Sequence, residues 1–354
     1  MRQRRAPRAQ SGQNPVRIRR QQEERRRRGV LIVGSVAFLF ILLIPLYGYY
    51  ASFIAPPRQV VAQVNGQSYN LGYLLKLLRM QQAGNLAQGQ SLNLGSLPFQ
   101  LVNLLAENEL IQQTAPRYKI IISQEDLDIE IRSRIMGEPS DSEASNDQLE
   151  REFQELYGRY LNLIQLSEDE HREVVNGDMY REAMREHVGQ SVPMVQPQAR
   201  VYKTTLPSAE NVDEIADEFR TEFARGAPFA SLVERFSTNN EEIRTGGELG
   251  WIPKDILPQI DSLLFEELNI GELSVPIPEL DSSAGEQRFV LYLVTEKSDA
   301  RELAEDHWDI LKVRALQQWL NDEREMNIIE THFTSENYDW LIKQLSLSSA
   351  STSG

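Results

Sequence analysis

The feature that most constrains this chain is an uncharged, apolar run from Gly29 to Ala55 that directly follows an arginine-rich tail. Residues 1–28 hold eleven arginines against two glutamates. Because a helix of about 20 apolar residues crosses a hydrocarbon core of roughly 30 Å, the run is long enough to span a bilayer. Arginines beside a span resist translocation, so the pattern predicts a basic cytoplasmic tail at 1–28, a transmembrane helix at 29–55 and an exported remainder.

A cleaved signal peptide is the competing interpretation of this run. Its apolar stretch is usually about 7–15 residues long and ends in a small-residue cleavage site. The run here is longer and ends in the bulky segment from Phe53 to Pro57, which favours an uncleaved anchor. The chain has no cysteine, which excludes a lipidated cysteine, disulfides and thiolate chemistry.

The predicted exported part is strongly acidic. The chain has 37 Lys+Arg and 52 Asp+Glu; subtracting the tail's 11 arginines and 2 glutamates leaves 26 basic and 50 acidic residues, a net charge of −24. Such a charge favours solubility and disfavours nucleic acid as a partner. The arginine-rich tail could bind phosphates, but beside a span we interpret it as a topological signal.

Residues 58–190 are predicted to be mostly helical. A short strand at Val60–Val64 and a tight turn at Asn65-Gly66 open the segment. Apolar residues then recur every three or four positions, as in Leu71, Leu74, Leu75 and Leu78 and again in Leu149, Phe153, Leu156, Tyr160 and Leu163. These stripes are too amphipathic for membrane spans, so the segment is predicted to form helical hairpins.

Residues 197–299 predict a compact α+β unit. Strand patterns at 199–206 and 288–295 enclose helical patterns at 211–225, 229–236 and 258–268 and a glycine-rich turn at 245–251. Residues 300–345 return to a helical pattern, in which Trp308, Leu311, Ala315 and Trp319 share one face. The serine-rich end, 346–354, is predicted to be disordered.

Four segments of the α+β unit carry a family resemblance. They run from Ala227 to Ser237, from Gly246 to Trp251, from Leu257 to Phe265 and from Gly271 to Pro276. In this order, over residues 198–298, they resemble a parvulin domain, a peptidyl-prolyl isomerase module. With the helical segments on either side, the whole resembles exported foldases of the SurA, PrsA and PpiD type. The resemblance implies a SurA-like helical chaperone domain at 58–190, an inserted parvulin-like domain at 197–299, and helices at 300–345 that pack back on the chaperone domain.

The resemblance also implies where a prolyl site would lie. Its first histidine position falls on Lys203, its second on Val290, and its Asp or Cys position on Asn239, so both family histidines are absent. Ile256 and Ile260 fall near the Met and Phe of the proline pocket. The candidate peptide-binding groove consists of Trp251, Ile256, Leu257, Ile260 and Phe265. A plain role in the core is the alternative for these side chains, and for Phe265 it is the preferred one.

No other constellation in the sequence indicates chemistry. The four histidines, at 171, 187, 307 and 332, have no second ligand at metal spacing, so we expect no metal. No serine stands in a G-x-S-x-G setting, and Gly246-Gly247 does not open a nucleotide-binding unit, so we expect no cofactor.

Three functional hypotheses follow. The first is a foldase or chaperone, anchored by a single span in the bacterial cytoplasmic membrane with its C-terminal domain outside the cytoplasm, that binds unfolded or proline-containing exported polypeptides through a degenerate parvulin domain. The second is an active parvulin-class isomerase. The third is a structural subunit of a membrane complex with one fixed partner.

Overall fold

The computed structural model describes residues 41, 43–87, 89–90, 93–137, 145–207, 211–280 and 287–352. Within these ranges no helix combines the length and the apolar character needed to cross a membrane. The predicted tail at 1–28 and residues 29–40 and 42 of the predicted span at 29–55 lie outside the described residues. The described end of that run is helical at 41 and 43–49 and continues into a π-helical turn, η1 (Tyr50–Ile54), and a 3₁₀ turn, η2 (Pro56–Arg58).

The chain divides into two compact units. The first comprises Met1–Ala106, Glu138–His171 and Ile328–Gly354, and the second comprises Glu107–Gly137 and Arg172–Asn327. The division passes through two helices, α3 (Leu97–Thr114) and α6 (Glu168–Gly189). It therefore differs from the predicted boundaries near 190 and 300, because parts of the helical segment cluster with the α+β unit.

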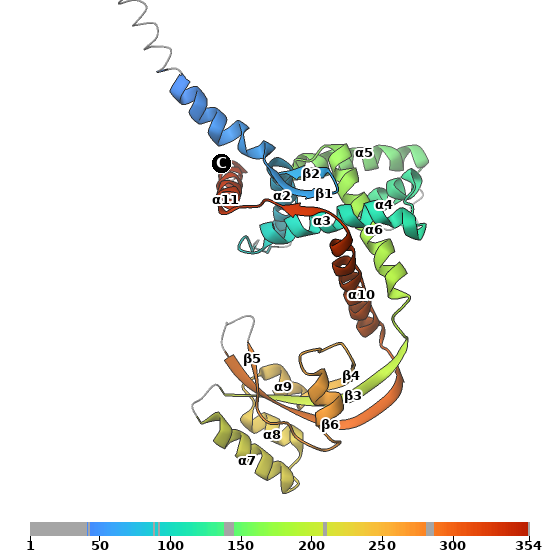
Figure 1. Cartoon of the computed structure of the whole chain (residues 1–354), viewed down its shortest axis with the longest axis vertical. Coiled ribbons are helices and arrows are strands. Elements are labelled where there is room, and N and C mark those ends of the chain that lie inside the picture. Colours follow the sequence, from blue (N-terminus) through green and yellow to red (C-terminus); the bar gives the residue numbers. More distant parts are fainter. Residues whose placement is uncertain are drawn as a thin grey trace, which may run out of the picture. The chain divides into compact units, whose positions relative to one another are not determined.

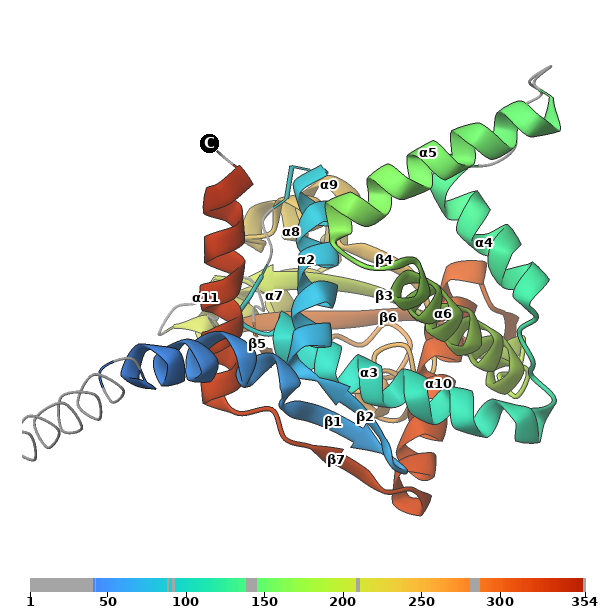
Figure 2. The same cartoon turned by 90° about the horizontal axis from the view of Figure 1, so that it is seen from above.

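The first unit is built on a three-stranded antiparallel sheet in the order β2-β1-β7 (Figure 2). The strands β1 (Val60–Val64) and β2 (Gln67–Asn70) form the predicted hairpin, whose turn residues Asn65 and Gly66 both have positive φ. The third strand, β7 (Ile329–Thr331), was not predicted. It comes from the far end of the chain and is held where Asn65 N donates to Ile328 O at 2.9 Å.

Helices cover this small sheet. The helix α2 (Leu71–Ala87) packs beside β2, and α5 (Asn146–Ile164) and α11 (Ser335–Thr352) pack on α2; the first part of α3 belongs to the same unit. The predicted stripe from Leu71 to Leu78 is buried, as the helical period requires. The last helix, α11, continues to Thr352, into the serine-rich end for which composition predicted disorder. Its buried Leu341 and Leu345 fix the preceding turns on the unit, so the helix can extend beyond them.

The second unit contains a four-stranded antiparallel sheet in the order β4-β3-β6-β5 (Figure 1). Its strands are β3 (Val195–Leu206), β4 (Glu248–Pro253), β5 (Ile277–Leu280) and β6 (Gln287–Glu302). The helices α7 (Val212–Ala224) and α8 (Phe229–Phe236) pack on one face through Leu206, Phe219 and Phe229. A short helix, α9 (Asn240–Thr245), lies beside β3.

The other face of the sheet has its own core. Ala199, Val201, Val290 and Val294 contact a segment that includes the π-helical turn η4 (Leu263–Glu267), where a longer helical pattern was predicted. Leu303 and Leu311 complete this core, and Trp308 packs against it. The start of α10 (Glu305–Met326) therefore belongs to the core of the α+β fold, although the sequence placed a boundary at residue 299.

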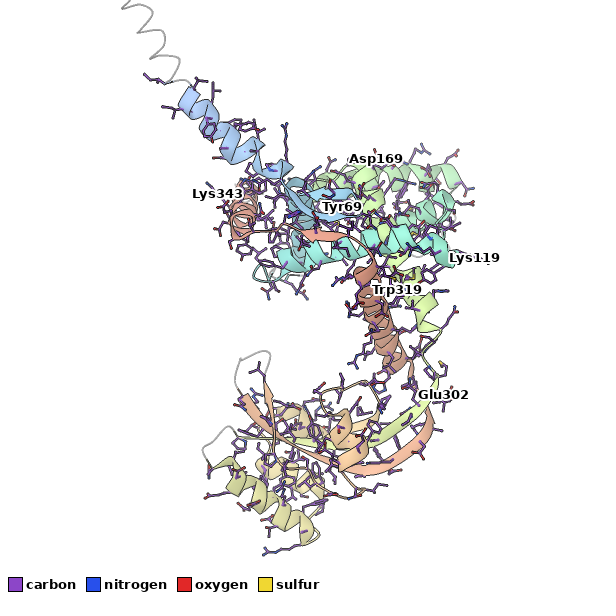
Figure 3. All side chains as sticks on the ribbon, viewed as in Figure 1. Tyr69, Lys119, Asp169, Glu302, Trp319 and Lys343 are labelled. Carbon is purple, nitrogen blue, oxygen red and sulfur yellow. The ribbon has the colours of Figure 1, made fainter. Side chains whose placement is uncertain are left out.

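The later turns of α10 contact the helical part of the second unit, which also holds η3 (Ala115–Tyr118) and α4 (Gln124–Met136). Trp319, labelled on α10 in Figure 3, donates from Nε1 to the Tyr118 hydroxyl at 3.0 Å. Lys312 pairs with Glu186 of α6 at 2.8 Å. One helix thus contacts both the α+β core and the helices of its unit. The fold is mostly helical α+β, as predicted.

Candidate peptide-binding site

Lys203 and Val290, the two positions that the resemblance assigns to family histidines, lie on one face of the four-stranded sheet. Lys203 of β3 pairs with Tyr292 of β6, and Thr205 pairs with Val290. Because side chains alternate along a strand, Lys203 and Thr205 share the face of Val201, which is also the face of Val290 and Tyr292. The strand register therefore brings Lys203 and Val290 to the same region.

Val290 is part of the core at this face. Its side chain is 1% exposed and belongs to the cluster with Val201 and Val294. Valine has no polar atom, so this position offers no hydrogen bond to a peptide.

A buried carboxylate, which the sequence analysis did not identify, lies beside Lys203. Glu242 of α9 is 4% exposed. It accepts hydrogen bonds from Thr205 N at 2.6 Å, from Thr205 Oγ1 at 2.7 Å and from Ser237 Oγ at 2.7 Å. Lys203 Nζ lies 3.7 Å from the same carboxylate. Three hydrogen bonds and one cation occupy this carboxylate, which is the usual condition for burying a charge.

Asn239 positions that carboxylate rather than facing a substrate. Its Oδ1 accepts from the backbone N–H groups of Glu241 at 2.9 Å and Glu242 at 3.3 Å, so it is the N-cap of α9. The cap starts the helix where Glu242 falls against β3. Asn239, which the resemblance assigned to an Asp or Cys position, thus holds the start of a short helix.

Tyr292 provides a second polar group on this face. Its buried hydroxyl donates to the Glu279 carboxylate of β5. Burial raises the pKa of Tyr292 well above its ordinary value, and the carboxylates of Glu279 and Glu242 add to the increase. The phenol therefore stays protonated and neutral throughout the physiological range.

The loop after β4 carries four of the five groove candidates. Ile256 and Ile260 are buried in the core of this face, while Leu257 and Phe265 are partly buried against it. Arg314 of α10 donates from Nη2 to Ile256 O at 2.7 Å and so fixes the loop from outside.

The same loop is also tied internally. Asp255 has a positive φ of 67° and donates its N–H to Asp261 Oδ2 at 2.7 Å. Burial raises the pKa of the Asp261 carboxyl, and its other oxygen, Oδ1, is buried without a hydrogen-bond partner among the described residues. The loop is therefore held at both ends in one conformation.

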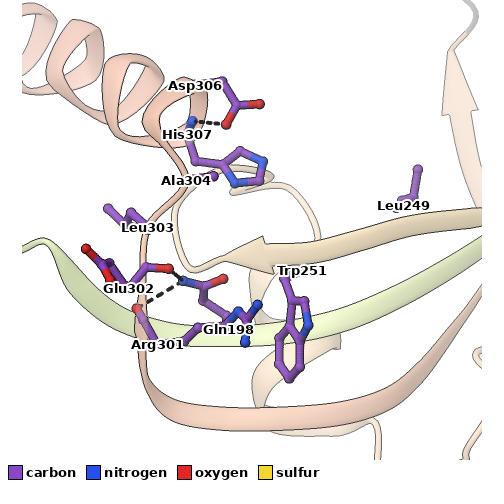
Figure 4. A pocket seen from close by; sticks show the side chains of 9 residues that line it. All are labelled: Gln198, Leu249, Trp251, Arg301, Glu302, Leu303, Ala304, Asp306 and His307. Carbon is purple, nitrogen blue, oxygen red and sulfur yellow. Dashed lines mark hydrogen bonds between the residues drawn. The ribbon is translucent and has the colours of Figure 1, made fainter.

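Trp251 does not join these residues. Its neighbour Ile252 points into the core, so alternation directs Trp251 to the other face of the sheet. There its ring stacks under the Arg301 guanidinium, whose Cζ lies 4.4 Å from the ring centroid. The two line a cavity of about 640 Å³ (Figure 4). The rest of the lining is Gln198, Leu249, Glu302, Leu303, Ala304, Asp306 and His307.

One histidine is buried. His171, in the first unit, is buried, and its Nδ1 lies 3.0 Å from the Tyr157 hydroxyl. Among the residues that the structure describes, no three His, Cys, Asp or Glu side chains are grouped as metal ligands would be.

Comparison with known proteins identifies the class. Residues 194–295 match the Rotamase family, described as the PPIC-type PPIASE domain. The chain therefore contains a parvulin-type peptidyl-prolyl isomerase domain, which confirms the predicted resemblance.

Two relatives show which proteins with such a domain the chain resembles. It is 32% identical over 69 residues to the chaperone SurA of Chromohalobacter salexigens. This alignment covers 19% of this chain and 16% of that protein. It is 24% identical over 132 residues to the foldase protein PrsA of a Geobacillus species, covering 35% of this chain and 48% of the foldase. The chain is thus related to the PrsA and SurA foldases, although the matches span less than half of either relative.

The similarity extends to solved structures. The peptidylprolyl isomerase PrsA of Bacillus anthracis has 19% sequence identity and a TM-score of 0.36, and the alignment covers 70% of this chain and 97% of that one.

Proposed function

We propose that this protein is a membrane-anchored, extracytoplasmic foldase or chaperone that binds unfolded or proline-containing segments of exported proteins, with a parvulin domain that has lost most of its catalytic capacity. The family of the domain and the kinship with PrsA and SurA support the foldase class. The uncharged run after eleven arginines supports the anchor and its orientation.

The main support for a loss of catalysis is that the Glu242 carboxylate is already fully bonded within the protein. Polar groups that can exchange hydrogen bonds with the twisting amide would help to lower the barrier to prolyl rotation, which amide resonance sets at about 18–20 kcal/mol. Here Glu242 is already bonded to Thr205 and Ser237 and paired with Lys203. Val290 is apolar, and Tyr292 is committed to Glu279. No histidine is present to take their place.

Exposed apolar surface supports the binding of clients. In the first unit, Phe99 is exposed and lies 5.1 Å from Phe333 and 5.9 Å from Tyr338, measured between ring centroids. Leu86 and Leu163 are also exposed in this unit. Aromatic side chains of this kind bind extended apolar segments with little loss of conformational entropy.

The test compares two activities of the full chain in lipid nanodiscs. One assay measures proline isomerisation in tetrapeptides by protease coupling, and the other measures suppression of aggregation of an unfolded client. We expect strong suppression with weak or undetectable turnover. Turnover equal to that of a histidine-bearing parvulin would replace the proposal with an active isomerase. Failure of both assays, with one stoichiometric partner recovered from membranes, would favour a structural subunit.

A further inference from the structure

The apolar N-terminal helix ends at a carbonyl that its own backbone cannot satisfy. Ser52 O would accept from residue 56 in an α-helix or from residue 57 in a π-helix, and the turn here is π-helical, with Ala55 N donating to Tyr50 O at 2.9 Å. Both Pro56 and Pro57 lack an N–H. The donor comes instead from α11, where Trp340 Nε1 donates to Ser52 O at 2.9 Å.

The joint between this helix and the first unit is short and packed. Asn337 of α11, itself buried, donates to the side chain of Gln59, whose backbone carbonyl accepts from Leu71 N at 2.8 Å. On the other side, Pro57 lies so close to α2 that a Cβ added at Gly72 would stand 3.1 Å from it. The chain therefore passes from the apolar helix into the unit without a free linker.

The side chains of the apolar helix are exposed on every face. Between 47% and 73% of the surface of each of these residues is exposed: Ile41, Leu43, Ile44, Leu46, Tyr47, Tyr49, Tyr50 and Phe53. A helix on a protein surface buries one apolar stripe, whereas these positions cover all sides. The sequence continues without charge back to Gly29. A surrounding of hydrocarbon is the environment that suits a helix apolar all round.

We propose that Trp340 lies in the interfacial layer of the bilayer, where it caps the end of the span, and that α11 thereby seats the first unit directly on the outer leaflet. The proposal rests on the membrane anchoring proposed above. Tryptophan favours this layer because its ring is apolar and its N–H needs an acceptor. An unsatisfied carbonyl is costly where water is scarce, so the indole stabilises the helix end.

The charges of α11 determine the lipid that suits the test. Glu336 and Asp339 oppose an anionic surface, while Lys343, labelled in Figure 3, is attracted to phosphate. The contact of α11 with the bilayer therefore depends on insertion of Trp340 into the interfacial layer rather than on attraction between net charges. Zwitterionic phosphatidylcholine is the appropriate probe.

The experiment measures the depth of Trp340 by fluorescence. The full chain, with Trp251, Trp308 and Trp319 each replaced by Phe, is placed in phosphatidylcholine nanodiscs whose acyl chains carry bromine either near the headgroup or near the chain end. We expect strong quenching by the shallow bromines and weaker quenching by the deep ones. In a matched chain, Trp308, Trp319 and Trp340 are replaced by Phe and Trp251 is retained. Its fluorescence should be quenched neither by the shallow bromines nor by the deep ones.

The outcomes separate the two proposals. If the chain stays in the nanodisc and Trp340 is quenched no more than Trp251, the seating is refuted while the anchor stands. If the chain does not remain in the nanodisc, the anchor itself fails. A second variant tests the cap without removing other tryptophans: Trp340→Phe should speed tryptic cleavage after Arg58 severalfold, and Trp251→Phe should not. Equal cleavage rates in the two variants would overturn the capping role.

Discussion

Lys203 Nζ of β3 lies 3.7 Å from the buried Glu242 carboxylate of α9. Thr205 and Ser237 hold the same carboxylate with three hydrogen bonds. Lys203, Glu242, Thr205 and Ser237 therefore form a closed polar cluster, in which the cation and the anion satisfy each other. Such a cluster stabilises the site and leaves it little freedom to respond to a twisting peptide bond.

This relationship makes Glu242 a determinant of stability. Glu242→Gln preserves the shape but removes the charge, so the pair with Lys203 and part of the bonding to Thr205 are lost. We expect the free energy of unfolding to fall by about 2–4 kcal/mol, because the buried site loses its charged hydrogen-bond acceptor and the partly exposed Lys203 loses its partner. Urea titration followed by circular dichroism measures it. Glu241→Gln, at the exposed neighbouring position, should change little, and equal losses in both variants would contradict the role of burial.

Activity should respond to restoring the histidines. Lys203→His together with Val290→His should raise turnover of proline tetrapeptides above the wild-type level, if the apolar loop from Ile256 to Phe265 still receives a prolyl ring. Val290→His alone should destabilise the fold by about 1–3 kcal/mol, because it places an unpaired polar group in a core position. Protease-coupled kinetics and urea titration report the two effects. A double variant that folds but gains no turnover would show that the loop itself is closed.

The sequence predicted that Lys203 and Val290 belong to one site, but it did not predict the buried carboxylate of Glu242 beside them. The assignment of Lys203 and Val290 to one site depends on local motif spacing and stays a prediction, while the register of β3 with β6 places both residues on one face. Glu242 stands among Glu241 and Arg244 in a charged stretch, which in a sequence alone resembles a solvated helix start. Only the docking of α9 on β3 buries one of these glutamates. Thr205 and Glu242 are 37 positions apart, so their contact leaves no periodic pattern in the sequence.

The same distinction explains which contacts the sequence did not predict. The stripe from Leu71 to Leu78 followed from its period because one helix determines it. The joining of β7 to β1, and the entry of Leu303 and Leu311 into the sheet core, depend on contacts between distant segments. Trp251 was assigned to the groove by its motif, but strand alternation directs it to the other face.

The α+β fold should need the start of α10. A fragment of residues 197–299 lacks Leu303, Trp308 and Leu311, whereas a fragment of residues 192–316 contains all three. We expect the shorter fragment to be less stable by several kcal/mol, since loss of a buried large apolar side chain costs about 2–5 kcal/mol. Urea midpoints of the two fragments test this. Equal midpoints would show that the core is complete without α10.

Asp261 should make stability depend on pH. Its pKa is raised in the folded protein by burial, so the folded state binds a proton more readily than the unfolded chain. Its contribution to stability is therefore present below the unfolded pKa and is lost as pH rises through the folded pKa. Asp261→Asn can still accept from Asp255 N and removes this dependence. Relative to wild type, the variant should gain stability as the pH is raised from acidic to neutral, which thermal unfolding at both pH values measures; a constant difference would contradict the assignment.

Two glycines in helices offer a test of packing between α6 and α10. A Cβ at Gly189 would lie 2.5 Å from Lys312 Cγ and 2.7 Å from its Cδ. The lysine cannot move away freely, because it pairs with Glu186 at 2.8 Å and with Asp309 at 2.9 Å. Gly→Ala in a helix normally stabilises by up to about 1 kcal/mol, but overpacking costs about 1–3 kcal/mol. We therefore expect Gly189→Ala to be destabilising.

Gly158, within α5, is the matched control because nothing lies within 4 Å of a Cβ there. Gly158→Ala should stabilise the protein by about 0.5–1 kcal/mol through helix propensity alone. Calorimetric unfolding of the two variants should give shifts of opposite sign. Stabilisation by both would mean that Lys312 yields to the added methyl group, and that α6 and α10 are not tightly joined at this point.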